Sequence, residues 1–386
     1  MDFALSEERR LLAETAERFL RDHYPLETRH DNAAKPEGFC REAWKAFADL
    51  GLIAALLPPA VDGLGGDGED ILVVFEALGS RLVVEPFLAG AVLGATPILL
   101  SGSPSQQAML QDVISGDLLL AFAHGEKDSR YSDCEVRTKA ENWDGQWYLS
   151  GQKSVVLNGD TADVLVVTAR TSGEADAKDG LGLFLVKTGA DGLSRRSYGT
   201  IEGGQAAEIS FDDVPADPIG SPGEAYPVIE QTIAHGSLAI SAEALGIMEA
   251  SKNITLDYLK TRTQFGRPIG SFQNLQHRMV DMLLEIEQAR SAVMLAAGTL
   301  GADRVTRERH IAAAKNLIGR VGQLVAEESI QLHGGIAMTW DYQLGHYAKR
   351  LVMLDHLLGD TDHHLERFIS FSRMEDPTEG NERRPE

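Results

Sequence analysis

The spacing of apolar residues changes twice along this 386-residue chain. Up to about residue 116 they recur every three or four positions, as in amphipathic helices, whereas from Asp117 they gather in short β-rich runs separated by turn residues. After Tyr226 the helical spacing returns. At roughly 150 residues per domain, a chain of this length has room for two to three domains, which excludes a single small binding module.

The same changes predict three domains and a tail. Residues 1–116 should form an N-terminal helical domain, residues 117–220 a β domain, residues 221–374 a C-terminal domain and residues 375–386 a charged, disordered tail. Short strands without intervening helices favour an antiparallel sandwich or barrel, and four helical segments favour a four-helix bundle. The predicted fold class is therefore multidomain α and β. Residues 214–223, which contain three prolines, are predicted to be the linker that leaves the β domain.

Composition excludes several classes of partner. Acidic residues outnumber basic residues by 58 to 36, which gives a formal net charge of −22 and a field that repels nucleic acid. No apolar run reaches 18 residues, and the amino terminus lacks the basic and apolar regions of a signal peptide, so no membrane span or secretion is predicted. Cys40 and Cys134 lack Cys-x-x-Cys spacing, so no disulfide framework is predicted and a reducing cytoplasm fits.

One glycine-rich motif matches a dinucleotide-binding pattern. Residues 63–68 read GLGGDG, which fits G-x-G-x-x-G. The motif follows Pro58 and Pro59 rather than a strand, and no βαβ unit surrounds it. We interpret it as a turn between helices.

Two further segments carry ligand-binding chemistry. Residues 260–273 read KTRTQFGRPIGSFQ and lie between two long predicted helices, where Arg262 suits a pyrophosphate and Phe265 suits a flat ring. Residues 331–335 read QLHGG and end another predicted helix, where paired glycines expose backbone to a ligand. Alone, each segment is an ordinary helix connection or helix end. Together, they are suited to hold one extended ligand.

These two segments resemble the signature stretches of the flavin-dependent acyl-CoA dehydrogenases. The order of the domains is similar to that family over nearly the whole chain, and residues 211–215 (FDDVP) and 151–153 (GQK) match it as well. The resemblance implies that both segments reach across a subunit interface to the adenine and pyrophosphate of FAD held by a neighbouring subunit. The FAD contacts that it implies are Arg262, Gln264, Phe265, Gln273, Gln331, Gly334 and Gly335.

The family reaction removes a proton from the carbon α to a CoA thioester, and it therefore needs a carboxylate base. Most relatives place a glutamate where this chain has Leu358, before Gly359, and a minority place it where this chain has Gly236. The remaining candidates are Glu243, two helical turns beyond Gly236, and the less favoured Asp360. Glu243 is the predicted base, although its residue type and position favour a carboxylate paired with an arginine.

The loops that hold the flavin ring in relatives also differ. Residues 123–130 read AHGEKDSR and residues 155–158 read VVLN, neither of which matches the family pattern. The chain thus keeps the half-site that is donated to a partner and lacks the half-site that it would hold itself. With residues 345–350 and 359–365, this asymmetry resembles the small subunits of two-gene (α2β2) dehydrogenases, including those for dicarboxylic (pimeloyl-CoA), aromatic or steroid side-chain CoA esters.

The leading hypothesis is FAD-dependent α,β-desaturation of an acyl-CoA by a hetero-oligomer. Its partners would be a homologous large subunit and an electron-transfer flavoprotein. One alternative is a homo-oligomeric enzyme with Glu243 as base, and another is a catalytically inactive binding or scaffold subunit. No metal is predicted at the histidines and aspartates of residues 355–364, because the inferred chemistry uses none.

Overall fold

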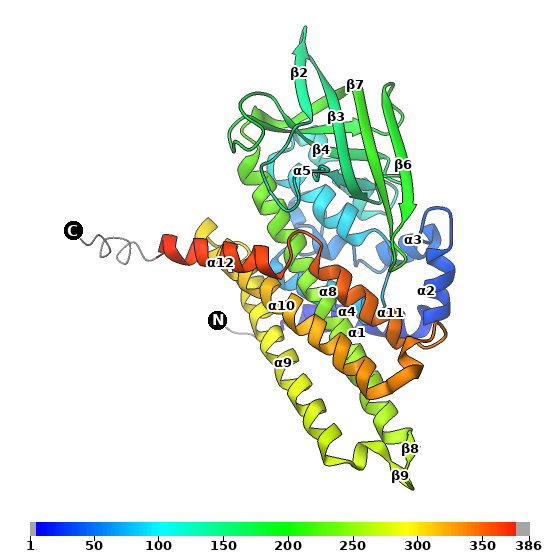
Figure 1. Ribbon diagram of the computed structural model, residues 1–386. Helices are drawn as coiled ribbons and strands as arrows, with labels where there is room; N and C mark the ends of the chain where they lie inside the picture. Colours follow the sequence, from blue (N-terminus) through cyan, green and yellow to red (C-terminus); the bar gives the residue numbers. More distant parts are fainter. Residues whose placement is uncertain (1–4, 376–386) are drawn as a thin grey trace, which may run out of the picture. The chain divides into compact units, whose positions relative to one another are not determined.

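The computed structural model describes residues 5–375 of the chain. The predicted tail therefore lies, apart from Glu375, outside the described residues. The chain divides into two compact units, the first made of residues 1–26, 67–83 and 237–386 and the second of residues 27–66 and 84–236. Figure 1 shows the helices and strands of both units, which are described separately below.

The second unit contains a closed sheet. The strands are β1 (Leu120–Ala123), β2 (Lys139–Trp143), β3 (Gln146–Leu157), β4 (Val164–Arg170), β5 (Leu181–Lys187), β6 (Leu193–Gly199) and β7 (Gln205–Gly223). The pairs β2–β3, β3–β7, β7–β5 and β5–β4 are antiparallel, and a parallel contact between β4 and β2 closes the ring. β1 adds to β4 in parallel, and β6 pairs with β7. The predicted barrel is confirmed, with a parallel edge at β1.

The barrel follows from local sequence. Asp144 and Gly145 join β2 to β3 with φ values of 54° and 91°, the left-handed pair that a two-residue hairpin turn needs. Inward residues of the strands form one buried apolar core, which includes Leu149, Val167 and Phe184. The predicted linker at residues 214–223 is wrong, because β7 runs through it to Gly223, pairing first with β3 and then with β5. The hydrogen bonds of these strand pairs compensate for the backbone N–H donors that the prolines lack.

Short helices complete the second unit. They are α2 (Leu26–Ala33), α3 (Arg41–Asp49), η1 (Ala54–Leu56), η2 (Pro59–Val61), the π-helical η3 (Phe87–Gly94), α5 (Ala95–Ser101), α6 (Pro104–Gln107) and α7 (Leu110–Ile114). η3 packs on β1, and its eight residues are all buried.

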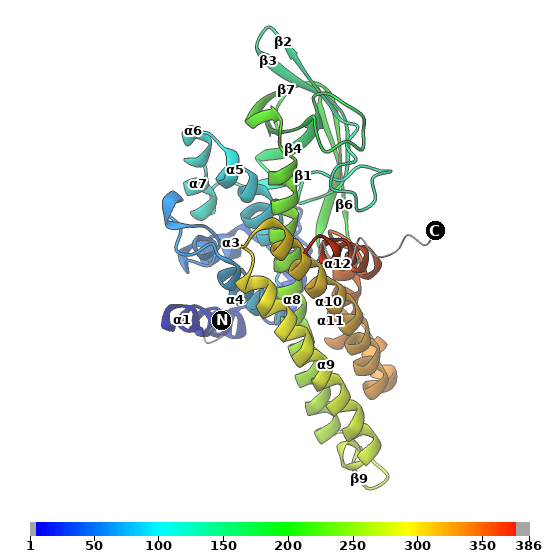
Figure 2. The same cartoon turned by 90° about the vertical axis from the view of Figure 1, so that its left-hand side faces the viewer.

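The first unit is helical. It contains α1 (Glu7–His23), α4 (Gly68–Gly79), most of α8 (Tyr226–Thr261), the short strands β8 (Thr263–Gln264) and β9 (Arg267–Pro268), η4 (Ile269–Ser271), α9 (Gln273–Gly298), α10 (Arg304–His333), η5 (Gly334–Met338), α11 (Leu344–Asp355) and α12 (Thr361–Glu375). Figure 2 shows α8, α9 and α10 side by side, with β9 at one end of the group. The helical, sheet, helical order of the predicted fold is confirmed, although two helices, α11 and α12, replace the single fourth segment.

The glycine-rich motif is the turn that the sequence predicts. Asp67 caps α4 by accepting hydrogen bonds from the backbone N–H groups of Glu69 and Asp70. Arg9 of α1 forms ion pairs with all three of these acidic residues, which holds α1 against the start of α4. The helix N-terminus is thus already satisfied by side chains of the chain itself.

Two glycines allow the first unit to pack closely. A Cβ atom added to Gly79 of α4 would lie 2.1 Å from the carbonyl oxygen of Glu243, and one added to Gly246 of α8 would lie 2.0 Å from that of Glu76. The backbones of α4 and α8 therefore touch, which a larger residue at either position would prevent. No helix in residues 5–375 is long and apolar enough to cross a membrane.

Candidate functional site

The Arg262 loop folds as a small β-hairpin at the end of α8. β8 and β9 pair across Phe265 and Gly266, whose φ values of 53° and 77° form the two-residue turn. Residues 261–268 are all exposed, and Phe265 keeps 90% of its surface in solvent. Within the described part of the chain, the Arg262 guanidinium has no hydrogen bond or ion pair. The hairpin therefore presents an aromatic ring and a free cation.

The second segment ends α10. Gly334 takes a φ of 70°, which only glycine adopts without strain, and a Cβ atom at Gly334 or Gly335 would meet nothing within 4 Å. Gln331 is exposed one turn earlier. The glycine backbone therefore faces open space in this chain.

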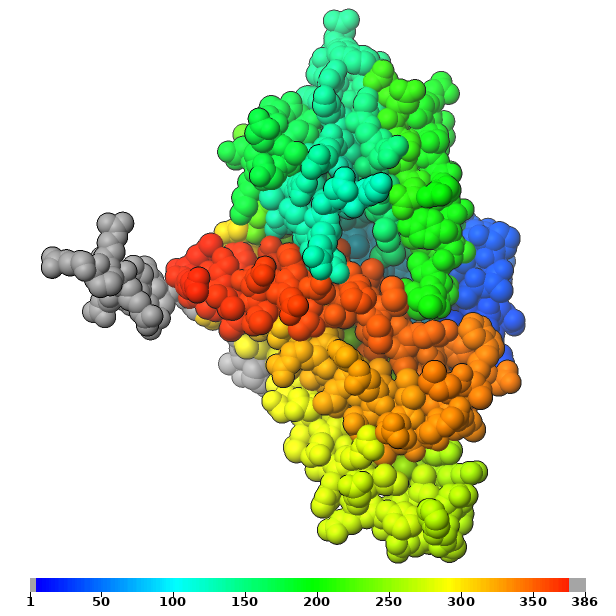
Figure 3. Space-filling view, in the orientation of Figure 1, coloured from blue at the N-terminus to red at the C-terminus, as the bar shows by residue number. Residues whose placement is uncertain are grey.

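Aromatic rings join the two segments. Tyr258, in the last turn of α8, stacks on His333 with ring centroids 4.3 Å apart and an interplanar angle of 23°. Tyr342 lies 5.3 Å from His333 and 6.5 Å from Tyr258. Figure 3 shows the orange surface around η5 meeting the yellow-green surface at the end of α8. The structure thus brings together the two segments that the sequence singles out.

These residues fit the ADP portion of a flavin dinucleotide. A guanidinium without a partner suits a pyrophosphate, an exposed ring suits adenine, and open glycine backbone permits close approach. Gln264 and Gln273 are exposed on the same hairpin and at the start of α9. The individual contacts to FAD stay predictions, but no side chain of the described chain fills the space at Gly334 and Gly335.

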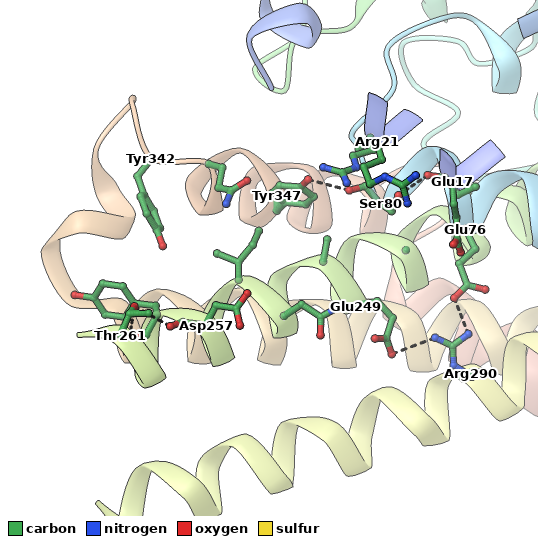
Figure 4. Close-up of a pocket in the computed structure, with 18 of the residues that line it drawn as sticks. Glu17, Arg21, Glu76, Ser80, Glu249, Asp257, Thr261, Arg290, Tyr342 and Tyr347 are labelled. Carbon is green, nitrogen blue, oxygen red and sulfur yellow. Dashed lines mark hydrogen bonds and ion pairs between the residues drawn. The ribbon is translucent and has the colours of Figure 1, made fainter. Parts of the chain in front are cut away.

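A cavity of about 890 Å³ borders this region within the first unit. One face of α8 forms its floor, Tyr342 and Thr261 lie at the end next to the hairpin (Figure 4), and Tyr258 also lines the cavity. At the other end, Arg290 pairs with Glu76 at 2.6 Å and with Glu249 at 3.1 Å. The lining is mixed, because charged residues and tyrosines alternate with aliphatic residues such as Ile254 and Ile336.

The usual base position lies in a tightly held turn between α11 and α12. Leu358 has a φ of 56° and Gly359 one of 107°. The buried Lys315 of α10 donates to the carbonyl oxygens of Leu354, Asp355 and Gly359 at 2.9–3.0 Å. Burial lowers the pKa of Lys315 to about 8, although Asp355 and Asp360 oppose the shift. The turn is therefore rigid, and its position 358 carries no ionisable group.

Both carboxylates that remained as base candidates have partners. Glu243 is buried and accepts two hydrogen bonds from Arg350 of α11, at 2.7 and 3.0 Å. This bidentate ion pair is the alternative that the sequence analysis left open for Glu243. Asp360 caps α12 by accepting from the backbone N–H of His363 at 2.9 Å. Proton abstraction by Glu243 would require Arg350 to withdraw.

The loop at residues 123–130 of the second unit is tied by its own side chains. Lys153, fully buried, donates to the His124 carbonyl, to Glu126 Oε1 at 2.8 Å and to Thr168 Oγ1. Burial raises the pKa of Glu126, but the Lys153 charge and hydrogen bonds from Thr138 outweigh it, so the net pKa is lowered. Burial and the Lys153 charge lower the pKa of His124 to about 4. His124 is therefore neutral, and the Glu126 carboxylate of the loop is already paired with Lys153.

The histidines near the C-terminus do not assemble a metal site. Within residues 5–375, no three His, Cys, Asp or Glu side chains converge as metal ligands. His356 is exposed, whereas the buried His364 donates from Nε2 to the Leu358 carbonyl at 2.9 Å.

Sequence reasoning missed several residues that organise the site. Tyr258 and Tyr342 showed no signal beyond their residue type. Lys315 had one, because it falls within the apolar seam of a predicted buried helix, where a lysine needs an explanation. Arg350 as the partner of Glu243 could not be assigned without knowing which helices meet.

Comparisons with protein-family models match nearly the whole chain. Residues 6–117 match the acyl-CoA dehydrogenase N-terminal domain, residues 121–214 the middle domain and residues 225–374 the C-terminal domain. A probable acyl-CoA dehydrogenase YngJ of Bacillus subtilis is 28% identical, covering 96% of this chain and 98% of that protein. Acyl-CoA dehydrogenase IpdE2 of Mycobacterium tuberculosis is 30% identical, with 89% and 91% covered.

Several solved structures are also similar to this chain. The Tcur3481–Tcur3483 steroid ACAD variant is 28% identical with a TM-score of 0.87, covering 96% of this chain and 99% of that one. The ChsE4–ChsE5 complex of Mycobacterium tuberculosis is 25% identical with a TM-score of 0.86, covering 97% and 99%. The FAD complex of PigA is 25% identical with a TM-score of 0.88, covering 97% and 100%.

Proposed function

This chain belongs to the acyl-CoA dehydrogenase family, and from that premise we propose that it is the small subunit of a hetero-oligomeric, FAD-dependent enzyme. In this proposal, it donates the adenine half of a flavin site to a homologous large subunit. FAD, when bound, accepts the hydride from the β carbon of the acyl-CoA. The large subunit supplies the base that removes the α proton, and electrons pass on to an electron-transfer flavoprotein.

One observation carries the proposal: the donated segments are open, while the chain's own catalytic positions are occupied. Arg262, Phe265 and Gly334 face solvent or empty space. By contrast, Leu358 cannot take a proton, and Glu243 has both carboxylate oxygens on Arg350. A chain with this distribution can complete a neighbour's site more readily than its own.

The residues of the chain would act mainly by binding and orientation. Arg262 would pair with the pyrophosphate, Phe265 would pack on the adenine and the Gly334–Gly335 backbone would approach the phosphates. The cationic guanidinium matters because the chain carries a net charge of −22 and FAD is anionic.

The test compares the purified chain with the chain co-expressed with its large-subunit partner. The lone chain should hold little flavin, whereas the pair should be yellow and oxidise acyl-CoA. Arg262→Ala in the pair should weaken FAD binding at least about tenfold, and Lys260→Ala, which removes an exposed neighbouring charge, should not. Full flavin occupancy and turnover by the lone chain would overturn the proposal.

Glu243→Gln separates this proposal from the homo-oligomeric alternative. If a partner supplies the base, the variant pair should keep most of its turnover at normal flavin content. Loss of turnover with flavin retained would instead assign the base to Glu243. Because similar solved structures include a steroid ACAD, steroid side-chain CoA esters are the first substrates to assay.

A further inference from the structure

Three rings from three parts of the first unit meet where the donated half-site begins. Tyr258 belongs to the last turn of α8, His333 is the last residue of α10, and Tyr342 lies in the segment that precedes α11. Tyr258 and His333 stack at 4.3 Å, and Tyr342 lies within 6.5 Å of both. We refer to these three residues as the aromatic cluster.

Both segments of the half-site start next to this cluster in the chain. The backbone N–H of Arg262 donates to the carbonyl of Tyr258 at 2.8 Å, so the hairpin starts from the turn that carries the Tyr258 ring. Gly334 follows His333 directly in the chain. The stack of Tyr258 on His333 therefore joins the two places in the chain from which Arg262 and the Gly334–Gly335 backbone start.

The other contacts of the hairpin run within its own loop and to Phe272 at the start of α9, where Phe265 lies edge-on at 6.1 Å and Arg267 lies 4.1 Å from the ring centroid. The hairpin residues are exposed, and the bonds they make are local: Thr263 and Gln264 pair with Arg267 and Pro268, and Ile269 N–H donates to the Arg262 carbonyl at 2.9 Å. Contacts of this kind hold the hairpin together but do not hold it to α10.

His333 is held in one state within the cluster. Its ring is buried, and Nδ1–H donates to the Ser329 carbonyl at 2.8 Å, which leaves Nε2 as the unprotonated nitrogen. Within the described residues, Nε2 has no hydrogen-bond partner. Burial lowers the pKa of His333, so the ring stacks on Tyr258 as a neutral imidazole. A neutral ring avoids a buried charge between the helices.

We propose that the aromatic cluster is the positioning unit of the donated half-site, holding the Arg262 hairpin at a fixed distance from Gly334 and Gly335. It acts through those residues rather than by touching FAD itself. This inference rests on the proposed function, because an FAD half-site gives the fixed separation its purpose. The competing explanation is that the rings merely pack α8 against α10.

The first measurement needs no flavin. Amide hydrogen exchange of residues 263–267 in the full chain should become about fivefold faster in Tyr258→Leu, because one aromatic pair is lost. Tyr258→Phe keeps the ring and should exchange at the wild-type rate. Tyr148→Leu is the matched control, because Tyr148 stacks on Trp143 at 4.7 Å in the other unit. Unchanged exchange in Tyr258→Leu would overturn the proposal.

The second measurement uses the co-expressed pair. The Kd for FAD should rise about fivefold in Tyr258→Leu and stay within about twofold in Tyr258→Phe and Tyr148→Leu. A lowered melting temperature with unchanged FAD affinity would show plain helix packing and contradict the proposal. If the wild-type pair binds no flavin, the proposed function fails, while the exchange measurement still decides whether the cluster positions the hairpin.

Discussion

Two turns of the first unit share a positive-φ backbone conformation but differ in their surroundings. Phe265–Gly266 and Leu358–Gly359 each place a non-glycine residue at positive φ, 53° and 56°, before a glycine at positive φ. The first turn is fully exposed, and the second is fixed by Lys315 and His364 through four backbone carbonyls. We refer to them as the open turn and the latched turn.

The two turns differ in what their backbone holds: the first places a side chain in solvent, and the second is held inside the chain. In the open turn, Phe265 takes a positive φ and keeps 90% of its surface in solvent, with its ring edge-on to Phe272. In the latched turn, the carbonyl oxygens of Leu358 and Gly359 accept hydrogen bonds from His364 and Lys315, and the position where the resemblance places the base carries a leucine. Under the proposed function, the open turn would contact a neighbour's flavin, whereas the latched turn carries no group that could take a proton.

The largest effect on stability should come from removing the Lys315 amine that holds the latched turn. Lys315→Met removes the donor to three buried carbonyls and should lower the free energy of unfolding by about 3 kcal/mol. Lys260→Met, beside the open turn, should change it by less than about 0.5 kcal/mol because Lys260 is exposed. Denaturant melts of the two variants test this, and equal effects would remove the distinction between the turns.

The contribution of Lys315 to the free energy of unfolding should also depend on pH, with a sign that follows from its lowered pKa. The pKa of Lys315 falls from 10.5 to about 8 in the folded chain. Between these values the unfolded state binds more protons, so the free energy of unfolding rises with pH. The stability gap between wild type and Lys315→Met should therefore widen by about 2 kcal/mol from pH 8 to 10.

Burial also lowers the pKa of Lys153 to about 8, so Lys153 adds a similar pH dependence to the unfolding of both proteins. Subtracting the free energy of unfolding of Lys315→Met from that of wild type cancels this shared contribution. Denaturant melts at several pH values measure the gap. A gap that narrows with rising pH would contradict the assigned shift.

The open turn should affect binding and not stability. Phe265→Ala should raise the Kd for FAD of the co-expressed pair about fivefold, the size of one lost aromatic contact. Its melting temperature should match wild type, because 90% of the Phe265 surface is exposed. A stability loss without a change in flavin binding would assign Phe265 a structural role instead.

The smallest expected effect compares the same substitution at both turns. Asparagine enters the left-handed region more readily than phenylalanine or leucine. Phe265→Asn should therefore change the free energy of unfolding by less than about 0.5 kcal/mol, since the relieved backbone strain offsets the loss of one exposed edge contact with Phe272. Leu358→Asn should lower it by about 0.5 kcal/mol, because the half-buried leucine loses apolar contacts. The reverse order in denaturant melts would contradict the comparison.

The sequence predicted the domain order and the barrel because local periodicity determines them. It predicted a linker where β7 runs through Pro215 and Pro218, since strand pairing depends on distant partners. For the same reason, Arg262 and Gly334 could be chosen from sequence, whereas the ring stack that joins them and the arginine on Glu243 required the folded helices.

The central claim is that this chain completes a neighbour's flavin site and holds no complete site itself. The most direct test is the flavin content of the co-expressed pair, measured as FAD absorbance against total protein. If each site combines a large-subunit ring half with this chain's adenine half, the complex should hold about one FAD for every two chains. One FAD for every chain would show that this chain also binds its own flavin and would contradict the account.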